Sequence, residues 1–239
     1  MPNPYFKFKQ FAVYHDKCAM KVGTDGVLLG AWATISRKKN ILDVGTGSGL
    51  ISLMLAQRTK AFPLIDAIDI EADAVVQAVI NVDNSPFGNI RCIETSLQDF
   101  TLMPCRKYDL IVSNPPFFSS SLKSPEKKRT LARHTDTLPI EELFLHSKSL
   151  LNQEEGILSI IYPYTEKKYL LELAGKTGLS VSRITNVIPT ADSTPKRVLM
   201  EFSIKPVSNI IENNLTIEKG RHIYTDEFID LVKDFYLRI

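Results

Sequence analysis

Asp43-Val44-Gly45-Thr46-Gly47-Ser48-Gly49-Leu50 is the stretch of this sequence that decides the fold. It follows the apolar pair Ile41-Leu42 and precedes a helical pattern that runs from Leu50 to Arg58. Glycines between a strand and a helix let the chain turn sharply and let its backbone approach a ligand closely. The stretch therefore predicts a ligand-binding loop after the first strand of an open α/β sheet.

Short apolar runs alternate with helical patterns on the C-terminal side of this loop, as is typical of βα units around a largely parallel sheet. We expect five such strands, at 41–44, 64–70, 89–94, 108–113 and 155–162, and helices at 50–58, 71–84, 139–151 and 166–176. Two last strands, at 181–188 and 197–204, have no helical pattern between them and should form an antiparallel hairpin, followed by a helix at 225–236. The predicted fold is α/β and Rossmann-like, with a seven-stranded, mostly parallel sheet.

Residues 1–39 differ in pattern and are expected to form a short N-terminal extension to a domain at 40–239. Residues 11–15 alternate apolar and polar like a strand, and residues 17–22 are the expected partner strand. Thr24 is expected to cap a helix that ends near Ala33.

The amino-acid composition limits the classes of protein to which this chain can belong. The chain has 239 residues, of which 44% are hydrophobic, so it can bury a core without disulfides or metals. Its net charge of +2 does not by itself indicate a nucleic-acid partner. The three cysteines Cys18, Cys92 and Cys105 form no C-x-x-C pair, and no apolar stretch has the length of a membrane span or signal peptide. We expect a cytoplasmic monomer without metal or membrane partner.

Acidic residues at the ends of successive strands indicate what the loop binds. Leu50 stands where a dinucleotide fingerprint has its third glycine, which argues against NAD. Asp43 suits a ligand that carries an amino group and a sulfonium, as S-adenosylmethionine does. Asp69 can accept hydrogen bonds from both ribose hydroxyls, although Glu71 competes for this role. Asp99 is placed to accept from an adenine amino group.

Asn114-Pro115-Pro116-Phe117 follows the fourth predicted strand directly, where open α/β sheets bind ligands. An amino group on an aromatic ring is a poor nucleophile because its lone pair is delocalised. Two acceptors for its hydrogens, the Asn114 side chain and the Pro115 carbonyl, would orient it, while Pro116 stiffens the loop. Phe117 can stack on a planar base. The motif therefore predicts methylation of an exocyclic amino nitrogen.

With these two motifs the sequence resembles class I amino-methyltransferases, and the segment from Met20 to Trp32 resembles the bacterial tRNA1(Val) (adenine-37) methyltransferase family. Arg133-His134 also fits that family's pattern. The resemblance implies methylation of the adenine on the 3′ side of the anticodon, with cofactor contacts from Lys21, Thr24 and the glycine loop. It further implies catalysis by Asn114 with Phe117. Phe118 departs from the tyrosine that this family often has at that position.

A basic run after the catalytic motif is expected to hold RNA phosphates. Its members are Lys127, Lys128, Arg129 and Arg133. Two other substrates remain open at this point, a glutamine side chain of peptide release factors and a guanine of ribosomal RNA. A cofactor-binding module without turnover is disfavoured by the intact catalytic motif.

Overall fold

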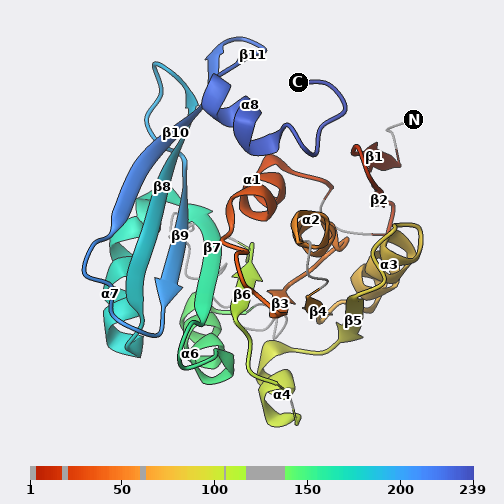
Figure 1. The fold of residues 1–239 in the computed structure, drawn as a ribbon, viewed down its shortest axis with the longest axis vertical. Coiled ribbons are helices and arrows are strands. Elements are labelled where there is room, and N and C mark those ends of the chain that lie inside the picture. Colours follow the sequence, from red (N-terminus) through yellow and green to blue (C-terminus); the bar gives the residue numbers. More distant parts are fainter. Residues whose placement is uncertain (1–3, 18–20, 60–62, 105, 117–137) are drawn as a thin grey trace, which may run out of the picture.

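A computed structural model of the chain describes residues 4–17, 21–59, 63–104, 106–116 and 138–239. One twisted sheet runs through it, with helices on both faces (Figure 1). The strand order in this sheet is β11-β10-β8-β9-β7-β6-β3-β4-β5. Within the described residues no helix is long and apolar enough to cross a membrane.

Five parallel strands form the half of the sheet that carries the glycine loop. They are β3 (Asn40–Val44), β4 (Leu64–Asp69), β5 (Ile90–Glu94), β6 (Leu110–Ser113) and β7 (Ile157–Pro163). Their order places β3 in the middle, so the chain moves outward from β3 in both directions. Ligands bind at such a reversal of strand order, beyond the carboxyl ends of the strands.

The predicted C-terminal hairpin is confirmed, but a sheet of seven strands was too small. β8 (Ser180–Thr190) pairs antiparallel with β9 (Arg197–Ser203), which also pairs antiparallel with β7. Two further strands, β10 (Ile211–Gly220) and β11 (Ile223–Tyr224), extend the sheet to nine. β10 pairs parallel with β8, and its Leu215 is buried, so the strand gains both a ladder and core contacts.

Helices cover both faces of the sheet, and the buried apolar side chains form two clusters. α2 (Leu50–Arg58) and α8 (Asp226–Val232) bury apolar side chains in one cluster, and α3 (Ala72–Asp83) adds Val82 to it. α4 (Leu97–Leu102), α6 (Ile140–Leu150) and α7 (Lys167–Thr177) bury theirs in the other. The periodicity of the sequence predicted each of these helices except α4.

The N-terminal residues form a hairpin and a helix, with two differences from expectation. β2 (Ala12–Tyr14) pairs with β1 (Tyr5–Lys7), and a tight turn closed by Phe8 N–H to Phe11 C=O joins the two strands. Of the partner strand expected at 17–22, residues 18–20 lie outside the described residues, and residues 17, 21 and 22 are not in a strand. α1 (Thr24–Trp32) begins at Thr24, and its N-cap is Gly23, without a side-chain bond. The predicted Thr24 cap was therefore wrong by one residue.

α1 packs against α2 and belongs to the same core cluster, with seven of its nine residues buried. A Cβ on Gly30 would come within 2.8 Å of the Met54 sulfur, so glycine is needed for the close approach of these helices. The division of the chain into an extension at 1–39 and a domain at 40–239 remains a prediction.

Candidate active site

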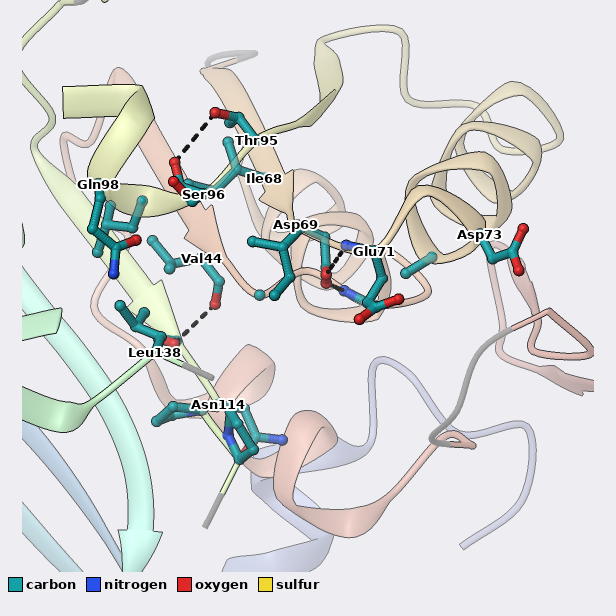
Figure 2. A pocket seen from close by; sticks show the side chains of 18 of the residues that line it. Val44, Ile68, Asp69, Glu71, Asp73, Thr95, Ser96, Gln98, Asn114 and Leu138 are labelled. Atoms are coloured by element: carbon teal, nitrogen blue, oxygen red, sulfur yellow. Dashed lines mark hydrogen bonds between the residues drawn. The ribbon is translucent and has the colours of Figure 1, made fainter. Parts of the chain in front are cut away.

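A cleft of about 570 Å³ opens beyond the carboxyl ends of β3, β4, β5 and β6. Its volume lies in the range typical of small-molecule sites. Figure 2 shows Asp69 and Glu71 on one side of the cleft, Gln98 and Leu138 on the opposite side, and Asn114 at one end. The two motifs singled out in the sequence thus meet at one site.

The glycine loop forms the floor of this cleft. The backbone N–H groups of Gly45 and Thr46 both donate to the carbonyl of Ile68, at 2.9 and 3.0 Å, which holds the loop against the end of β4. Gly45 and Gly47 line the cleft and have φ of 72° and 55°. A Cβ at either position would have no protein atom within 4 Å, so the space beside them is open to a ligand.

Gly49 serves a different purpose in the same loop. Its φ is 81°, and a Cβ there would lie 3.4 Å from the Ala78 Cβ on α3. It does not line the cleft. Gly49 therefore allows α3 to pack against the loop, whereas Gly45 and Gly47 leave room for a ligand.

Asp43 lies beneath the loop, fully buried at the end of β3. One carboxylate oxygen accepts from the Thr46 hydroxyl at 2.7 Å and from the Ser52 hydroxyl at 2.8 Å. Burial raises the pKa of Asp43 to about 6, against these two hydroxyl bonds, which lower it. The carboxylate thus ties the loop to the first turn of α2. The predicted contact between Asp43 and a ligand amino group remains a prediction, since Asp43 does not line the cleft.

Asp69 ends β4 and lines the cleft. Its carboxylate accepts from the Gly47 N–H at 2.8 Å and from the Glu71 N–H at 3.1 Å. These two bonds fix the carboxylate between the glycine loop and the start of α3. Glu71 also lines the cleft but is exposed, so Asp69 is the better held of the two acids.

The segment after β5 and the first turn of α4 close another side of the cleft, and sequence reasoning missed them. Thr95, Ser96, Leu97 and Gln98 line it. The Ser96 hydroxyl accepts from the Asp99 N–H at 2.9 Å and donates to the Asp99 carboxylate at 2.7 Å, which caps α4. Ser-x-x-Asp at a helix start was the signal available. Asp99 itself is exposed and lies outside the cleft lining.

Asn114, Pro115 and Pro116, of the motif predicted to be catalytic, line the cleft after the end of β6. The preceding Ser113 hydroxyl donates to the Val44 carbonyl at 2.8 Å, which keeps the motif beside the glycine loop. The Asn114 Oδ1 atom is buried and has no hydrogen-bond partner in the structure as described. Buried polar atoms are rarely left unpaired, and an unpaired one needs an explanation. A substrate donor that enters the cleft supplies one.

Several predicted residues lie elsewhere. Lys21 and Thr24 are exposed and do not line the cleft. Phe117, Phe118 and the predicted phosphate-binding residues lie outside the described part of the chain; the latter are Lys127, Lys128, Arg129 and Arg133. Lys17 and Leu138 line the cleft without having been predicted.

Comparison with known proteins identifies the family. Residues 19–164 match the family model for the methyltransferase small domain. A tRNA1(Val) (adenine(37)-N6)-methyltransferase from Parabacteroides distasonis is 52% identical over 240 residues, and the alignment covers all of both chains. The chain belongs to this methyltransferase family. The predicted resemblance is therefore confirmed over the full length.

Solved structures agree with the fold of this methyltransferase. A predicted O-methyltransferase from Agrobacterium tumefaciens has a TM-score of 0.67 at 18% identity, with 88% of this chain and 96% of that chain covered. A putative class I S-adenosylmethionine-dependent methyltransferase from Listeria monocytogenes has a TM-score of 0.56 at 13% identity, with 80% of this chain and 62% of that chain covered. The fold is thus that of class I methyltransferases.

The cleft of this methyltransferase fits S-adenosylmethionine, the methyl donor of class I enzymes. Space beside Gly45 and Gly47 is open, and Asp69 offers acceptors of the kind that ribose hydroxyls need. Three acids line the cleft, Asp69, Glu71 and Asp73, against one described cation, Lys17. This balance suits a ligand with a positively charged sulfonium.

Proposed function

We propose that this chain transfers the methyl group of S-adenosylmethionine to the exocyclic N6 of adenine 37 in tRNA1(Val), next to the anticodon. The observation that carries the proposal is the buried, unpartnered Asn114 Oδ1 at the donor cleft of a chain 52% identical to an enzyme of that name. A hydrogen-bond acceptor at this position can receive a hydrogen bond from the amino group of a substrate.

Asn114 and the backbone of Pro115 would receive the two hydrogens of the adenine amino group. The two prolines restrict the backbone that holds these acceptors, so their positions are set before the substrate arrives. With both hydrogens engaged, the nitrogen lone pair points away from the ring plane and toward the methyl group. Catalysis then consists largely of holding nitrogen and carbon in line at attack distance.

The bound donor supplies a methyl group made electrophilic by the positive sulfonium. The sulfonium would leave with the electron pair of the C–S bond as the new N–C bond forms. The methylated nitrogen carries the positive charge until one of its protons leaves to water, with the Asn114 oxygen next to that proton. No group of tuned pKa is required before attack.

The cofactor would be held by the glycine loop through Gly45 and Gly47, and by Asp69 at its ribose. The segment from Thr95 to Gln98 lies at the far end of the cleft from Asn114 and forms the site for the adenine of the cofactor (Figure 2). We propose that the chain acts as a monomer on the anticodon loop in the cytoplasm. A release-factor glutamine or a ribosomal guanine would use the same acceptors, and both are outcomes of the tests below.

Replacement of Asn114 tests the role of its side chain. We expect Asn114→Ala to lower kcat by about 10²–10³-fold, as when one oriented donor or acceptor is removed from an active site. The Kd of S-adenosylhomocysteine and of tRNA should stay within about twofold. Asn84→Ala, at the exposed asparagine that caps the C-terminus of α3, is the matched control. Unchanged kcat in Asn114→Ala would contradict the proposal.

A further inference from the structure

The N-terminal hairpin gathers the exposed aromatic side chains of the described residues. Tyr5, Phe6 and Tyr14 are 38%, 36% and 37% exposed, and every other aromatic side chain that the structure describes is buried or half-buried. The chain has 21 aromatic residues, so their exposure on one hairpin is selective. Exposed aromatic groups that lie together mark interaction sites more often than single ones do.

Strand pairing divides these side chains between two faces of the hairpin. Tyr5 lies opposite Tyr14, and their ring centroids are 5.4 Å apart. Lys7 lies opposite Ala12 on the same face, because alternate residues of a strand share a face. Phe6 is on the inner face and packs against Phe8. We call Tyr5, Tyr14 and Lys7 the outer face of the hairpin.

α3 connects the hairpin to the cleft. Asn81 on α3 bonds the backbone of Tyr14, and Gln77, one turn earlier, accepts from the Lys17 N–H at 3.1 Å. Asp73, one further turn earlier, lines the cleft together with the Lys17 side chain. The chain therefore runs along α3 from Tyr14 to Lys17 at the cleft, over about two helical turns.

The charge of this segment suits a polyanion. Residues 4–17 carry three lysines, Lys7, Lys9 and Lys17, against one acid, Asp16. Proteins that bind single-stranded nucleic acids combine such cations with aromatic rings on which unpaired bases stack. Loop nucleotides next to a base held in the cleft would lie within reach of these rings.

We propose that the outer face of the hairpin binds unpaired RNA nucleotides that flank the target base, by stacking on Tyr5 and Tyr14 and by a phosphate contact from Lys7. The inference rests on the proposed function, since it names the surface by which that substrate is held. It assigns RNA contacts to a part of the chain distinct from the basic run predicted at Lys127 to Arg133.

Steady-state kinetics with tRNA test this inference. A Tyr5→Ala/Tyr14→Ala variant should raise the KM for tRNA by about tenfold or more, because a base–aromatic stack is lost at each site. The KM for S-adenosylmethionine and kcat at saturating tRNA should stay within about twofold. Tyr5→Phe/Tyr14→Phe keeps both rings and should restore the wild-type KM. Leu145→Ala, at an exposed apolar residue on α6, is the matched truncation control.

Lys7→Ala should reduce the slope of log affinity against log salt by about one unit or less, as expected for one phosphate contact. Lys176→Ala, at an exposed lysine in the last turn of α7, should leave the slope unchanged. If the double alanine variant does not fold, zero-length photocrosslinking of 4-thiouridine-containing tRNA to the wild-type enzyme replaces it. A crosslink to the peptide with Tyr5 or Tyr14 supports the inference, and crosslinks confined to other peptides overturn it.

The outcomes separate this inference from the proposed function. A wild-type enzyme that methylates tRNA, with a KM for tRNA unchanged in the double alanine variant, overturns the inference alone. A wild-type enzyme that methylates no tRNA overturns the proposed function. A third outcome is that the wild-type enzyme binds anionic phospholipid vesicles and the double alanine variant does not, while the tRNA kinetics of the two are the same. This outcome would overturn the inference and assign the outer face to a membrane surface.

Discussion

The side-chain amide of Asn81 takes the place of a neighbouring strand for Tyr14. Its Oδ1 atom accepts from the Tyr14 N–H at 2.9 Å, and its Nδ2 atom donates to the Tyr14 carbonyl at 2.8 Å. The same Nδ2 donates to the Ser48 carbonyl in the glycine loop, also at 2.8 Å. One fully buried side chain thus connects the N-terminal hairpin to the cofactor loop.

We expect Asn81→Leu to destabilise the protein by about 2–4 kcal/mol, because it leaves buried backbone groups of Tyr14 and Ser48 unpaired. The Kd of S-adenosylhomocysteine should rise as well, since the loop loses a support. Urea unfolding and calorimetric titration measure the two effects. Asn84→Ala, at the C-cap of the same helix, removes a bond to the Ile80 carbonyl at an exposed position and should change neither. Equal stability of Asn81→Leu and wild type would contradict this role.

Asp69 and Glu71 are the two candidates for the proposed contact with the cofactor ribose, and the hydrogen bonds that hold Asp69 favour it. Asp69→Ala should weaken S-adenosylhomocysteine binding by tenfold or more, because it removes the proposed ribose acceptor and the bond to the Gly47 N–H. Glu71→Ala should weaken binding less, because that side chain is exposed and freely hydrated. Isothermal titration of both variants decides between them. A larger loss in Glu71→Ala would reverse the assignment.

Gly47 and Gly49 should respond differently to alanine. Both have positive φ, which costs a residue with a Cβ about 1–2 kcal/mol. The Cβ that Gly47→Ala adds meets no protein atom. The main effect should therefore be a loss of cofactor binding, because this Cβ occupies space in the cleft. Gly49→Ala presses on Ala78 and should lower the free energy of unfolding more than Gly47→Ala does. Thermal unfolding with and without S-adenosylhomocysteine separates the two, and an identical pattern for both variants would refute the distinction.

Asp43 should make stability depend on pH. Its pKa is about 6 in the folded protein and near 3.8 in the unfolded chain. The folded state therefore binds the proton more tightly, so this contribution to stability is largest below pH 4, falls as pH rises through 6, and is constant above. The loss amounts to roughly 3 kcal/mol, at 1.36 kcal/mol for each pKa unit.

Asp43→Asn keeps an oxygen for Thr46 and Ser52 but carries no charge. The free energy of unfolding of this variant, minus that of the wild type, should therefore increase between pH 4 and pH 6. Urea unfolding at half-unit steps of pH provides the comparison. A difference that stays constant over this interval would mean that the buried carboxyl is not responsible.

The sequence predicted the half of the fold around β3 well, because buried parallel strands and amphipathic helices carry strong periodic signals. It did not predict β10, because Asn213 interrupts the apolar alternation of Ile211, Leu215 and Ile217, and Asn214 is a second residue type that strands disfavour. Those asparagines are stabilised by side-chain bonds to Thr185 and Asn186 on β8. Such long-range bonds leave no local pattern.

The residues of the candidate site likewise include some that the sequence predicted and some that it did not. Asp69 and Asn114 were predictable because each follows an apolar strand, and parallel strands end at one edge of a sheet. Lys17 and Leu138 lie in segments outside these strand ends, so no spacing in the sequence predicts that they line the cleft. The Asp99 carboxylate accepts from the Ser96 hydroxyl at the start of α4, and its predicted contact with an adenine amino group remains a prediction.

The central claim, methylation of adenine 37 at N6, is tested most directly by nucleoside mapping. Transfer RNA from cells that lack the modification is incubated with labelled S-adenosylmethionine and either wild-type enzyme or Asn114→Ala, then digested and analysed by mass spectrometry. We predict N6-methyladenosine at position 37 of tRNA1(Val) with the wild type and none with the variant. Label on a guanine, on a release-factor glutamine, or on no acceptor at all would contradict the claim.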